Sequence, residues 1–205
     1  MAKIAIDDRY DPKEEIRHNE SLYIGYFRCL EHTFDLSMID SLCDVGCATG
    51  GLIKNFKSKY PDKAICGIEY FNWQKESADP LVKDYIILHD IRDKLSHGVR
   101  YDIVNCTEVG EHIDEELCPI LMDNLRSLCK KYLIMTWSHG GGKADPSHDP
   151  HQQHLNPLPY SEYVRLVGNY GFVKNDSLTK KFIDETARYP DFYSWWRDSL
   201  VVWDV

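Results

Sequence analysis

The sequence predicts an α/β fold, a doubly wound and mostly parallel sheet of seven strands with helices on both faces and an antiparallel last strand. Two observations predict this class. Short apolar segments of strand length alternate with amphipathic segments of helical period over residues 41–170, which is the pattern of parallel strands joined by crossover helices. A further apolar segment at residues 199–204 is the last strand, which we expect to lie antiparallel to its neighbours.

The elements follow one another in a regular order. Asn19 can cap a helix, and apolar side chains follow it at helical spacing as far as Leu30, so we expect a first helix there. Residues 1–18 are mostly charged, which predicts a mobile N-terminal leader before a single domain at residues 19–205. The expected strands are residues 41–45, 64–68, 85–88, 101–106, 132–136, 172–174 and 199–204. The expected later helices are residues 51–59, 73–77, 115–128, 160–170 and 177–187.

The composition is that of one globular domain. Of the 205 residues, 43% are hydrophobic and 28% are charged, which is enough to bury a core. The formal net charge of -9 argues against binding of nucleic acid by bulk electrostatics. The 7 cysteines lie in apolar segments, which indicates reduced thiols and a cytoplasmic protein. No apolar run is long enough to span a membrane, and residues 1–20 lack the apolar core of a signal peptide.

A glycine-rich turn, residues 44–51 (DVGCATGG), joins the first strand to the next helix. Its small residues allow close approach of a ligand, and the helix start offers unpaired N–H groups. A dinucleotide pyrophosphate is one candidate ligand. Asp44 opposes it, because a carboxylate repels pyrophosphate but can hold a cationic amino group through bridging water. A tight turn without a ligand is the third interpretation.

Acidic residues also end the next two strands. Glu69 lies 19 residues after Gly50, where a carboxylate can accept both hydroxyl groups of a ribose. Asp90 and Ile91 follow the third strand, and an Asp side chain with a backbone N–H can bind the edge of adenine. The three strand ends predict a nucleoside-binding crevice at the carboxyl edge of the sheet. Tyr70 is a candidate for stacking on the adenine.

This order of residues resembles the class I S-adenosylmethionine-dependent methyltransferases, and the resemblance covers residues 42–205. The glycine-rich turn, Glu69 and the Asp90–Ile91 pair match the family, and residues 107–113 (TEVGEHI) are similar to its "EVxEH" stretch. The resemblance implies a Rossmann-like sheet, S-adenosylmethionine as the methyl donor and S-adenosylhomocysteine as the product. It implies these cofactor-binding residues: Asp44, Gly46, Cys47, Ala48, Gly50, Glu69, Tyr70, Asp90, Ile91, Thr107 and Glu108.

The chain departs from the family pattern in two places. Ala48 replaces the middle glycine of the turn, which is a mild change. The Asn/Asp-Pro-Pro-Tyr/Phe signature of many enzymes that methylate nitrogen is missing, and residues 105–108 (NCTE) take its place. We therefore expect O-methylation. The resemblance, the acidic balance and the aromatic residues at 189–196 favour a sugar hydroxyl of a glycan or nucleotide-sugar as the acceptor.

A histidine-rich loop at residues 138–159 follows the fifth strand, at the edge that faces the transferred methyl group in this fold. Its length and glycine run predict a lid over the substrate. Histidine suits proton removal from a hydroxyl. The candidate general bases are His139 and His154, followed by Glu111 and His112, although a structural role for His112 is also open.

A divalent metal ion is a further possibility for this loop, but the sequence does not favour it. The available ligands are His139, Asp145, His148, Asp149, His151 and His154. Their spacing matches no fixed metal motif, and Mg²⁺ prefers oxygen ligands.

Three alternative functions stay open. They are a nucleic-acid methyltransferase acting on RNA ribose, a methyltransferase-like binding subunit without activity, and an NAD-dependent oxidoreductase. The acidic charge argues against a nucleic-acid partner, and the sequence indicates no particular oligomeric state.

Overall fold

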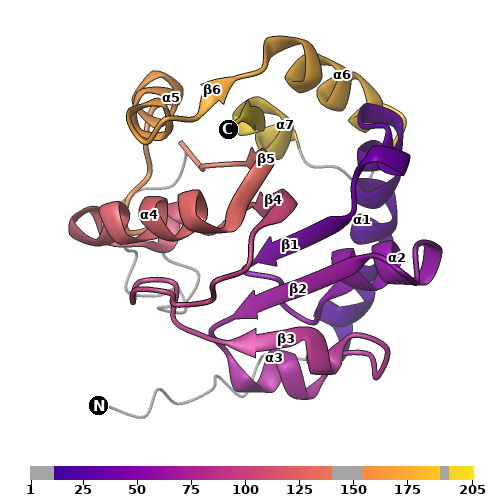
Figure 1. The fold of residues 1–205 in the computed structure, drawn as a ribbon. Coiled ribbons are helices and arrows are strands. Elements are labelled where there is room, and N and C mark those ends of the chain that lie inside the picture. Colours follow the sequence, from indigo (N-terminus) through magenta and orange to yellow (C-terminus); the bar gives the residue numbers. More distant parts are fainter. Residues whose placement is uncertain (1–11, 140–153, 190–193) are drawn as a thin grey trace.

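The computed structural model of the chain describes residues 12–139, 154–189 and 194–205. It contains one seven-stranded sheet with the strand order β3-β2-β1-β4-β5-β7-β6 (Figure 1). The strands are β1 Ser41–Val45, β2 Ala64–Glu69, β3 Ile86–Leu88, β4 Tyr101–Cys106, β5 Cys129–Met135, β6 Val173–Lys174 and β7 Val201–Asp204. The predicted fold class is confirmed, and every predicted strand is present within a few residues of its expected bounds.

The strand directions place a ligand crevice at one edge of the sheet. The strands β1 to β5 pair in parallel, and β7 runs antiparallel to both β5 and β6. The strands β1, β2 and β3 follow one another toward one edge of the sheet. The chain then returns to the other side of β1, where β4 pairs, so the strand order reverses between β1 and β4. Such a switch point is where open α/β sheets bind ligands, beside the carboxyl ends of the strands.

The helices are α1 Pro12–Thr33, α2 Gly51–Lys59, α3 Asn72–Glu76, α4 Cys118–Leu128, α5 Tyr160–Asn169, α6 Asp176–Thr186 and α7 Ser194–Ser199, with short 3-10 turns η1 Leu36–Met38, η2 Lys83–Tyr85, η3 Gly110–His112 and η4 Glu115–Leu117. The first helix begins at Pro12 and not at Asn19, because proline is well suited to a helix start. Residues 12–18, expected in the leader, therefore belong to α1, while residues 1–11 lie outside the described part of the chain.

Two apolar cores cover the two faces of the sheet. In Figure 1, α1 and α2 lie on one side of the strands and α4 on the other. Leu30 of α1, Ile53 of α2 and Phe182 of α6 share the first core. Leu125 of α4 and Tyr163 of α5 belong to the second. Both faces of the central strands are thus buried, which explains their continuous apolar sequences.

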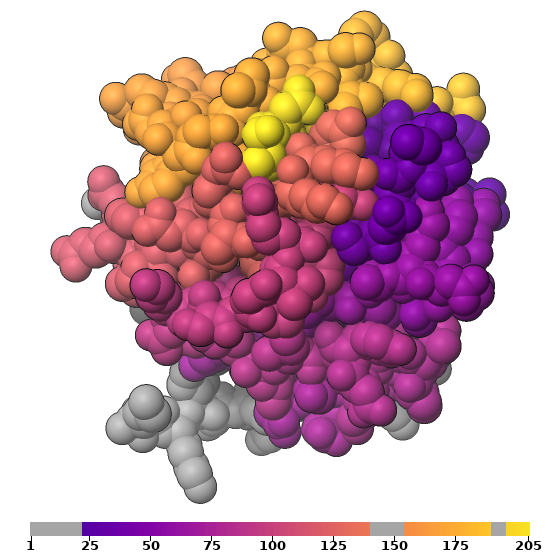
Figure 2. All heavy atoms as spheres, viewed as in Figure 1, coloured from indigo at the N-terminus to yellow at the C-terminus, as the bar shows by residue number. Residues whose placement is uncertain are grey.

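The strand β7 links the two cores at the far side of the sheet. Its residue Val202 packs in the first core, and its neighbours Val201 and Trp203 pack in the second, as the alternation of side chains along a strand requires. In Figure 2 the last residues of the chain reach the surface between β5 and the segment that holds α5 and α6. No helix in the described ranges has both the length and the apolar character to cross a bilayer.

All seven cysteines are buried and unpaired. This agrees with the reduced thiols that the sequence indicated. Burial raises the pKa of most of them, for example to about 12 for Cys29 and Cys129. These thiols therefore act as small apolar core residues.

Candidate active site

The turn between β1 and α2 needs glycine at its first position. Gly46 has a φ of 72°, and a Cβ atom there would lie 2.4 Å from the Val109 side chain. The N–H groups of Gly46 and Cys47 both donate to the Ile68 carbonyl, at 2.9 and 3.2 Å. The turn is thus fixed against the end of β2, with its backbone exposed toward the carboxyl edge of the sheet.

Glu69, at the end of β2, holds this turn from the other side. Its side chain accepts hydrogen bonds from the Ala48 N–H (2.9 Å) and the Phe71 N–H (2.8 Å). Burial raises the pKa of Glu69, although both hydrogen bonds oppose the rise. The carboxylate is therefore fixed in orientation by backbone donors on two successive segments.

Asp90, after β3, is paired with a residue that the sequence analysis missed. The Arg92 guanidinium donates to both carboxylate oxygens, at 2.9 Å from Nε to Oδ1 and 2.7 Å from Nη2 to Oδ2. Burial alone would raise the pKa of Asp90, but Arg92 outweighs it and lowers this pKa. The guanidinium carbon also lies 5.2 Å from the centre of the Tyr70 ring. Arg92 thus fixes the acid and the predicted stacking residue together.

Asp44 is buried on β1 and belongs to a chain of polar side chains that joins β1, the neighbouring strand β4 and α1. Asn105 Nδ2 donates to Asp44 Oδ1 (2.7 Å), and the Tyr26 hydroxyl donates to Asn105 Oδ1 (2.5 Å). The second oxygen, Asp44 Oδ2, receives no hydrogen bond from the described residues. Burial raises the pKa of Asp44 to about 7. Its negative charge near neutral pH is therefore costly unless a cation approaches.

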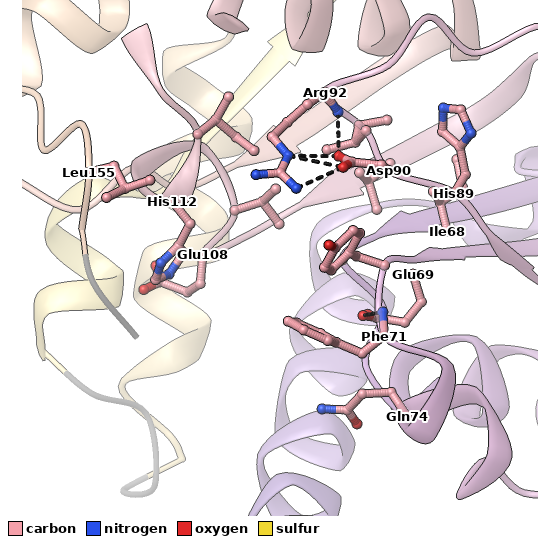
Figure 3. Close-up of a pocket in the computed structure, with 16 residues that line it drawn as sticks. Ile68, Glu69, Phe71, Gln74, His89, Asp90, Arg92, Glu108, His112 and Leu155 are labelled. Atoms are coloured by element: carbon pink, nitrogen blue, oxygen red, sulfur yellow. Dashed lines mark hydrogen bonds and ion pairs between the residues drawn. The ribbon is translucent and has the colours of Figure 1, made fainter. Parts of the chain in front are cut away.

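These strand ends surround a pocket of about 440 Å³. Figure 3 shows Glu69, Phe71 and Gln74 on one side and Glu108 and His112 on the opposite side. The predicted cofactor residues that line it are Gly46, Glu69, Tyr70, Asp90, Ile91 and Glu108. The predicted residues that do not line it are Asp44, Cys47, Ala48, Gly50 and Thr107.

Two of those residues have structural roles in the turn. The Cys47 sulfur would lie 2.6 Å from a Cβ added at Gly67, so its side chain packs against β2. Gly50 has a φ of 79° and begins α2. A Cβ there would lie 3.1 Å from Ile86 and 3.2 Å from Val82. Both positions shape the turn from behind the pocket.

The opposite wall begins directly after β4. Glu108 has a φ of 58°, which is uncommon for a residue with a side chain. The Thr136 hydroxyl at the end of β5 donates to Glu108 Oε1 (2.7 Å) and accepts from the Glu108 N–H (2.8 Å). This reciprocal pair stabilises the strained residue and directs its side chain. Burial and the neighbouring Glu111 raise the pKa of Glu108 to about 8.

A second connection brings His154 to this wall. The Asn156 N–H donates to the Glu111 carbonyl (2.9 Å), and the Trp137 indole N–H donates to the Asn156 carbonyl (2.7 Å). As a result, the rings of His112 and His154 have their centres 5.1 Å apart, nearly perpendicular. One nitrogen of each histidine and one carboxylate oxygen of Glu111 all lie within 4.8 Å of one another.

The predicted general bases therefore separate into two groups. Glu111, His112 and His154 form one cluster, and His112 also lines the pocket. His139 follows β5 and is exposed. Of the loop residues considered as metal ligands, Asp145, His148, Asp149 and His151 lie outside the described residues. The sequence analysis assigned Glu108 to the cofactor, but in the structure its carboxylate also belongs with Glu111, since the two influence each other's pKa.

The family model described as "Methyltransferase domain" matches residues 16–176. No curated protein matches the chain. Among solved structures, magnesium protoporphyrin IX methyltransferase from Synechocystis, with bound SAM, is 15% identical with a TM-score of 0.59, covering 98% of this chain and 86% of that one.

Two further structures have the same fold. The plantazolicin methyltransferase BpumL, in complex with a monoazolic desmethylPZN analog and SAH, is 15% identical with a TM-score of 0.62, covering 94% of this chain and 86% of that one. Human N-acetylserotonin methyltransferase, in complex with SAM, is 15% identical with a TM-score of 0.57, covering 93% of this chain and 55% of that one.

Proposed function

We propose that the chain, which belongs to the methyltransferase domain family, transfers the methyl group of S-adenosylmethionine to a hydroxyl group. The observation that carries the proposal is the pocket itself. Gly46, Glu69 and Asp90, from the ends of three successive strands, line one pocket of about 440 Å³. That volume suits a ligand of nucleoside size. Solved structures of the same fold are described as bound to SAM or SAH.

Each acid has a role in binding the cofactor. Glu69 accepts hydrogen bonds from the ribose hydroxyl groups with the carboxylate lone pairs that its two backbone donors leave available. Asp90 and the Ile91 N–H bind the adenine edge beside Tyr70. Asp44, a buried acid at the start of the turn, attracts the cationic amino group through water.

The acceptor binds between the cofactor and the opposite wall, where Glu108 and His112 line the pocket. The acceptor oxygen attacks the methyl carbon, the carbon–sulfur bond breaks, and S-adenosylhomocysteine leaves with the bonding electron pair. The hydroxyl proton passes to the cluster of Glu111, His112 and His154, with His154 as the first candidate base. Catalysis then comes from orientation and proton removal.

A hydroxyl acceptor is supported by two features. The cluster offers proton acceptors of the right type, and residues 105–108 lack the signature that binds a nitrogen nucleophile. We favour a sugar hydroxyl, as the family resemblance suggested. The aromatic residue Trp196 gives this choice no support, because it is buried against Tyr26 in the core.

The first test is calorimetric titration of the full chain with S-adenosylmethionine. We expect binding to the unmodified chain and at least tenfold weaker binding for Glu69→Ala. The matched control is Glu76→Ala, which removes an exposed glutamate from α3. A chain that does not bind S-adenosylmethionine would contradict the proposal.

The second test identifies the acceptor. Labelled S-adenosylmethionine is incubated with sugars, glycans, RNA and small phenols, and the labelled product is analysed. We expect the label as a methyl ether. A label on nitrogen would refute the hydroxyl acceptor, and a label on RNA ribose would refute the sugar of a glycan or nucleotide-sugar.

A further inference from the structure

The cluster of Glu111, His112 and His154 joins two segments that are distant in the sequence. Glu111 and His112 belong to η3 after β4, and His154 begins the segment that precedes α5. Their three potential ligand atoms lie within 4.8 Å of one another. Two imidazole nitrogens and a carboxylate oxygen at such separations are the ligands that proteins use for transition-metal ions.

The burial of Glu111 gives an independent reason to expect a cation. Glu111 is 0% exposed, and neither carboxylate oxygen has a hydrogen bond of ordinary geometry from a described residue. Burial raises the pKa of Glu111 and outweighs the Glu108 carboxyl and the backbone of Ser138, which lie close enough to lower it. No Lys or Arg in the described ranges forms an ion pair with Glu108 or Glu111. Buried carboxylates in proteins are ordinarily paired or coordinate a metal ion.

We infer that Glu111, His112 and His154 bind a divalent transition-metal ion, and that Glu108 supplies the fourth protein ligand. The set of two imidazoles and two carboxylates suits Mn²⁺, Fe²⁺, Co²⁺ or Zn²⁺ better than Mg²⁺ or Ca²⁺, which prefer oxygen ligands alone. The sequence analysis considered a metal ion only on the loop at residues 139–154. The site inferred here shares only His154 with that set.

The surroundings of the four residues hold them in place for such a role. Thr136 fixes the Glu108 side chain. Asn156 fixes the backbone of Glu111, and Trp137 holds Asn156 in turn. Ligand atoms about 2.1 Å from a common ion lie about 3 Å apart at adjacent octahedral positions. The cluster therefore closes around an ion through small side-chain rotations, with its backbone already positioned.

The place of the ion gives it a role in the transfer, and this part rests on the proposed function. Glu108 and His112 line the same pocket as Glu69, so the ion lies beside the proposed methyl donor. Four protein ligands leave two of six positions for oxygens of the acceptor. An acceptor hydroxyl bound to the ion loses its proton more readily. The imidazoles then act as metal ligands, and the proton of the acceptor hydroxyl passes to solvent water in place of His154.

The test is titration of the full chain with Mn²⁺, followed by electron paramagnetic resonance of the unbound ion. The protein carries no polyhistidine tag and is first treated with EDTA. Manganese is chosen because thiolates prefer softer ions, so the seven cysteines do not compete. We expect one bound Mn²⁺ per chain. Glu111→Gln, His112→Ala and His154→Ala should each weaken binding at least tenfold.

The control is His32→Ala, which removes an exposed histidine at the end of α1 and should bind Mn²⁺ like the unmodified chain. Thermal unfolding with and without Mn²⁺ provides a second measurement, and the ion should raise the Tm of the unmodified chain but not of the three variants. The inference is overturned if the unmodified chain binds no Mn²⁺, or if the three variants bind it as tightly.

Calorimetry with S-adenosylmethionine separates the two proposals. A chain that binds the methyl donor but no Mn²⁺ retains the proposed function and loses the metal site. A chain that binds Mn²⁺ but no methyl donor retains the metal site and loses the proposed function.

Discussion

Buried acids lie on both sides of the pocket, but their hydrogen-bond partners differ. On the wall formed by β1 to β3, Glu69 accepts two backbone N–H groups and Asp90 is held by Arg92. Behind the wall that Glu108 and His112 form after β4, Glu111 is fully buried, and its carboxylate oxygens have no hydrogen bond of ordinary geometry from a described residue. Glu108 beside it has a pKa of about 8.

The difference separates binding from chemistry. On the first wall, donors hold the carboxylates of Glu69 and Asp90 in place, so that they present fixed polar groups, as a binding site for a neutral ribose and adenine requires. The second wall concentrates negative charge and imidazoles in a buried place, where a positive charge is strongly stabilised. Changes to the two walls should therefore affect different measurable quantities.

The largest expected effect is a kinetic separation of the two walls. Glu111→Gln should lower kcat/KM by roughly 1000-fold, or about 4 kcal/mol, because it removes a group that acts on the acceptor. Its dissociation constant for S-adenosylmethionine should stay within about threefold. Glu69→Gln should do the reverse, with cofactor binding weakened roughly tenfold and kcat at saturating cofactor nearly unchanged. Steady-state kinetics and calorimetry measure kcat/KM and cofactor affinity for both variants. If both variants lose the two quantities to a similar degree, the two walls do not have separate roles.

The second effect concerns the glycine-rich turn of the first wall. Gly46→Ala should weaken cofactor binding roughly 100-fold, or about 2.7 kcal/mol, since the new Cβ would lie 2.4 Å from Val109 in a left-handed conformation. Gly98→Ala is the matched control. Gly98 has the same φ of 72° but open space around it. Calorimetry should show normal binding for the control, and equal losses would mean that backbone strain alone explains the effect.

The third effect concerns the free energy of unfolding, which leucine at Glu111 and leucine at Glu69 should change in opposite directions. Glu111→Leu should raise the free energy of unfolding by about 2 kcal/mol in the absence of metal, because it removes a buried carboxylate without a donor. Glu69→Leu should lower it by about 2 kcal/mol, because the N–H groups of Ala48 and Phe71 lose their acceptor. Urea unfolding at pH 7 after EDTA treatment measures both. Destabilisation by both substitutions would show that Glu111 has a structural partner.

The smallest effect is the pH dependence that Asp44 contributes. Burial raises its pKa to about 7 in the folded chain, against about 3.9 when unfolded. The folded state therefore binds the proton more tightly, and stability falls as the pH rises through this range. Between pH 6 and pH 8 the free energy of unfolding should fall by about 1.4 kcal/mol through this group. In urea unfolding at both pH values, Asp44→Asn should lack this fall in the free energy of unfolding. The same fall in the variant would show that another group causes it.

The sequence predicted the first wall well because that wall depends on local order. The bounds of β1 and α2 match their predicted ranges, since apolar period and glycine signals act over a few residues. Glu69 and Asp90 follow from the strand ends alone. Arg92 was missed because an exposed-looking basic residue gives no sign of pairing two positions back.

The second wall could be predicted only in part. Glu111, His112 and His154 were each named as candidates, but their common cluster depends on the segment at residues 154–156 folding back onto η3. That return is fixed by the contacts of Asn156 with Glu111 and Trp137, which join positions 19 or more residues apart. The start of α1 was also mispredicted, because charged side chains after Pro12 concealed the helix.

The position of β7 has a consequence for the order in which the chain is assembled during synthesis. Residues are made from the N-terminus, yet β7 lies between β5 and the earlier strand β6. Until residues 201–204 leave the ribosome, β6 has no strand to pair with and one edge of β5 is uncovered. We therefore expect closure of the sheet to follow synthesis of β7, with a nascent chain that until then presents an apolar strand edge to chaperones.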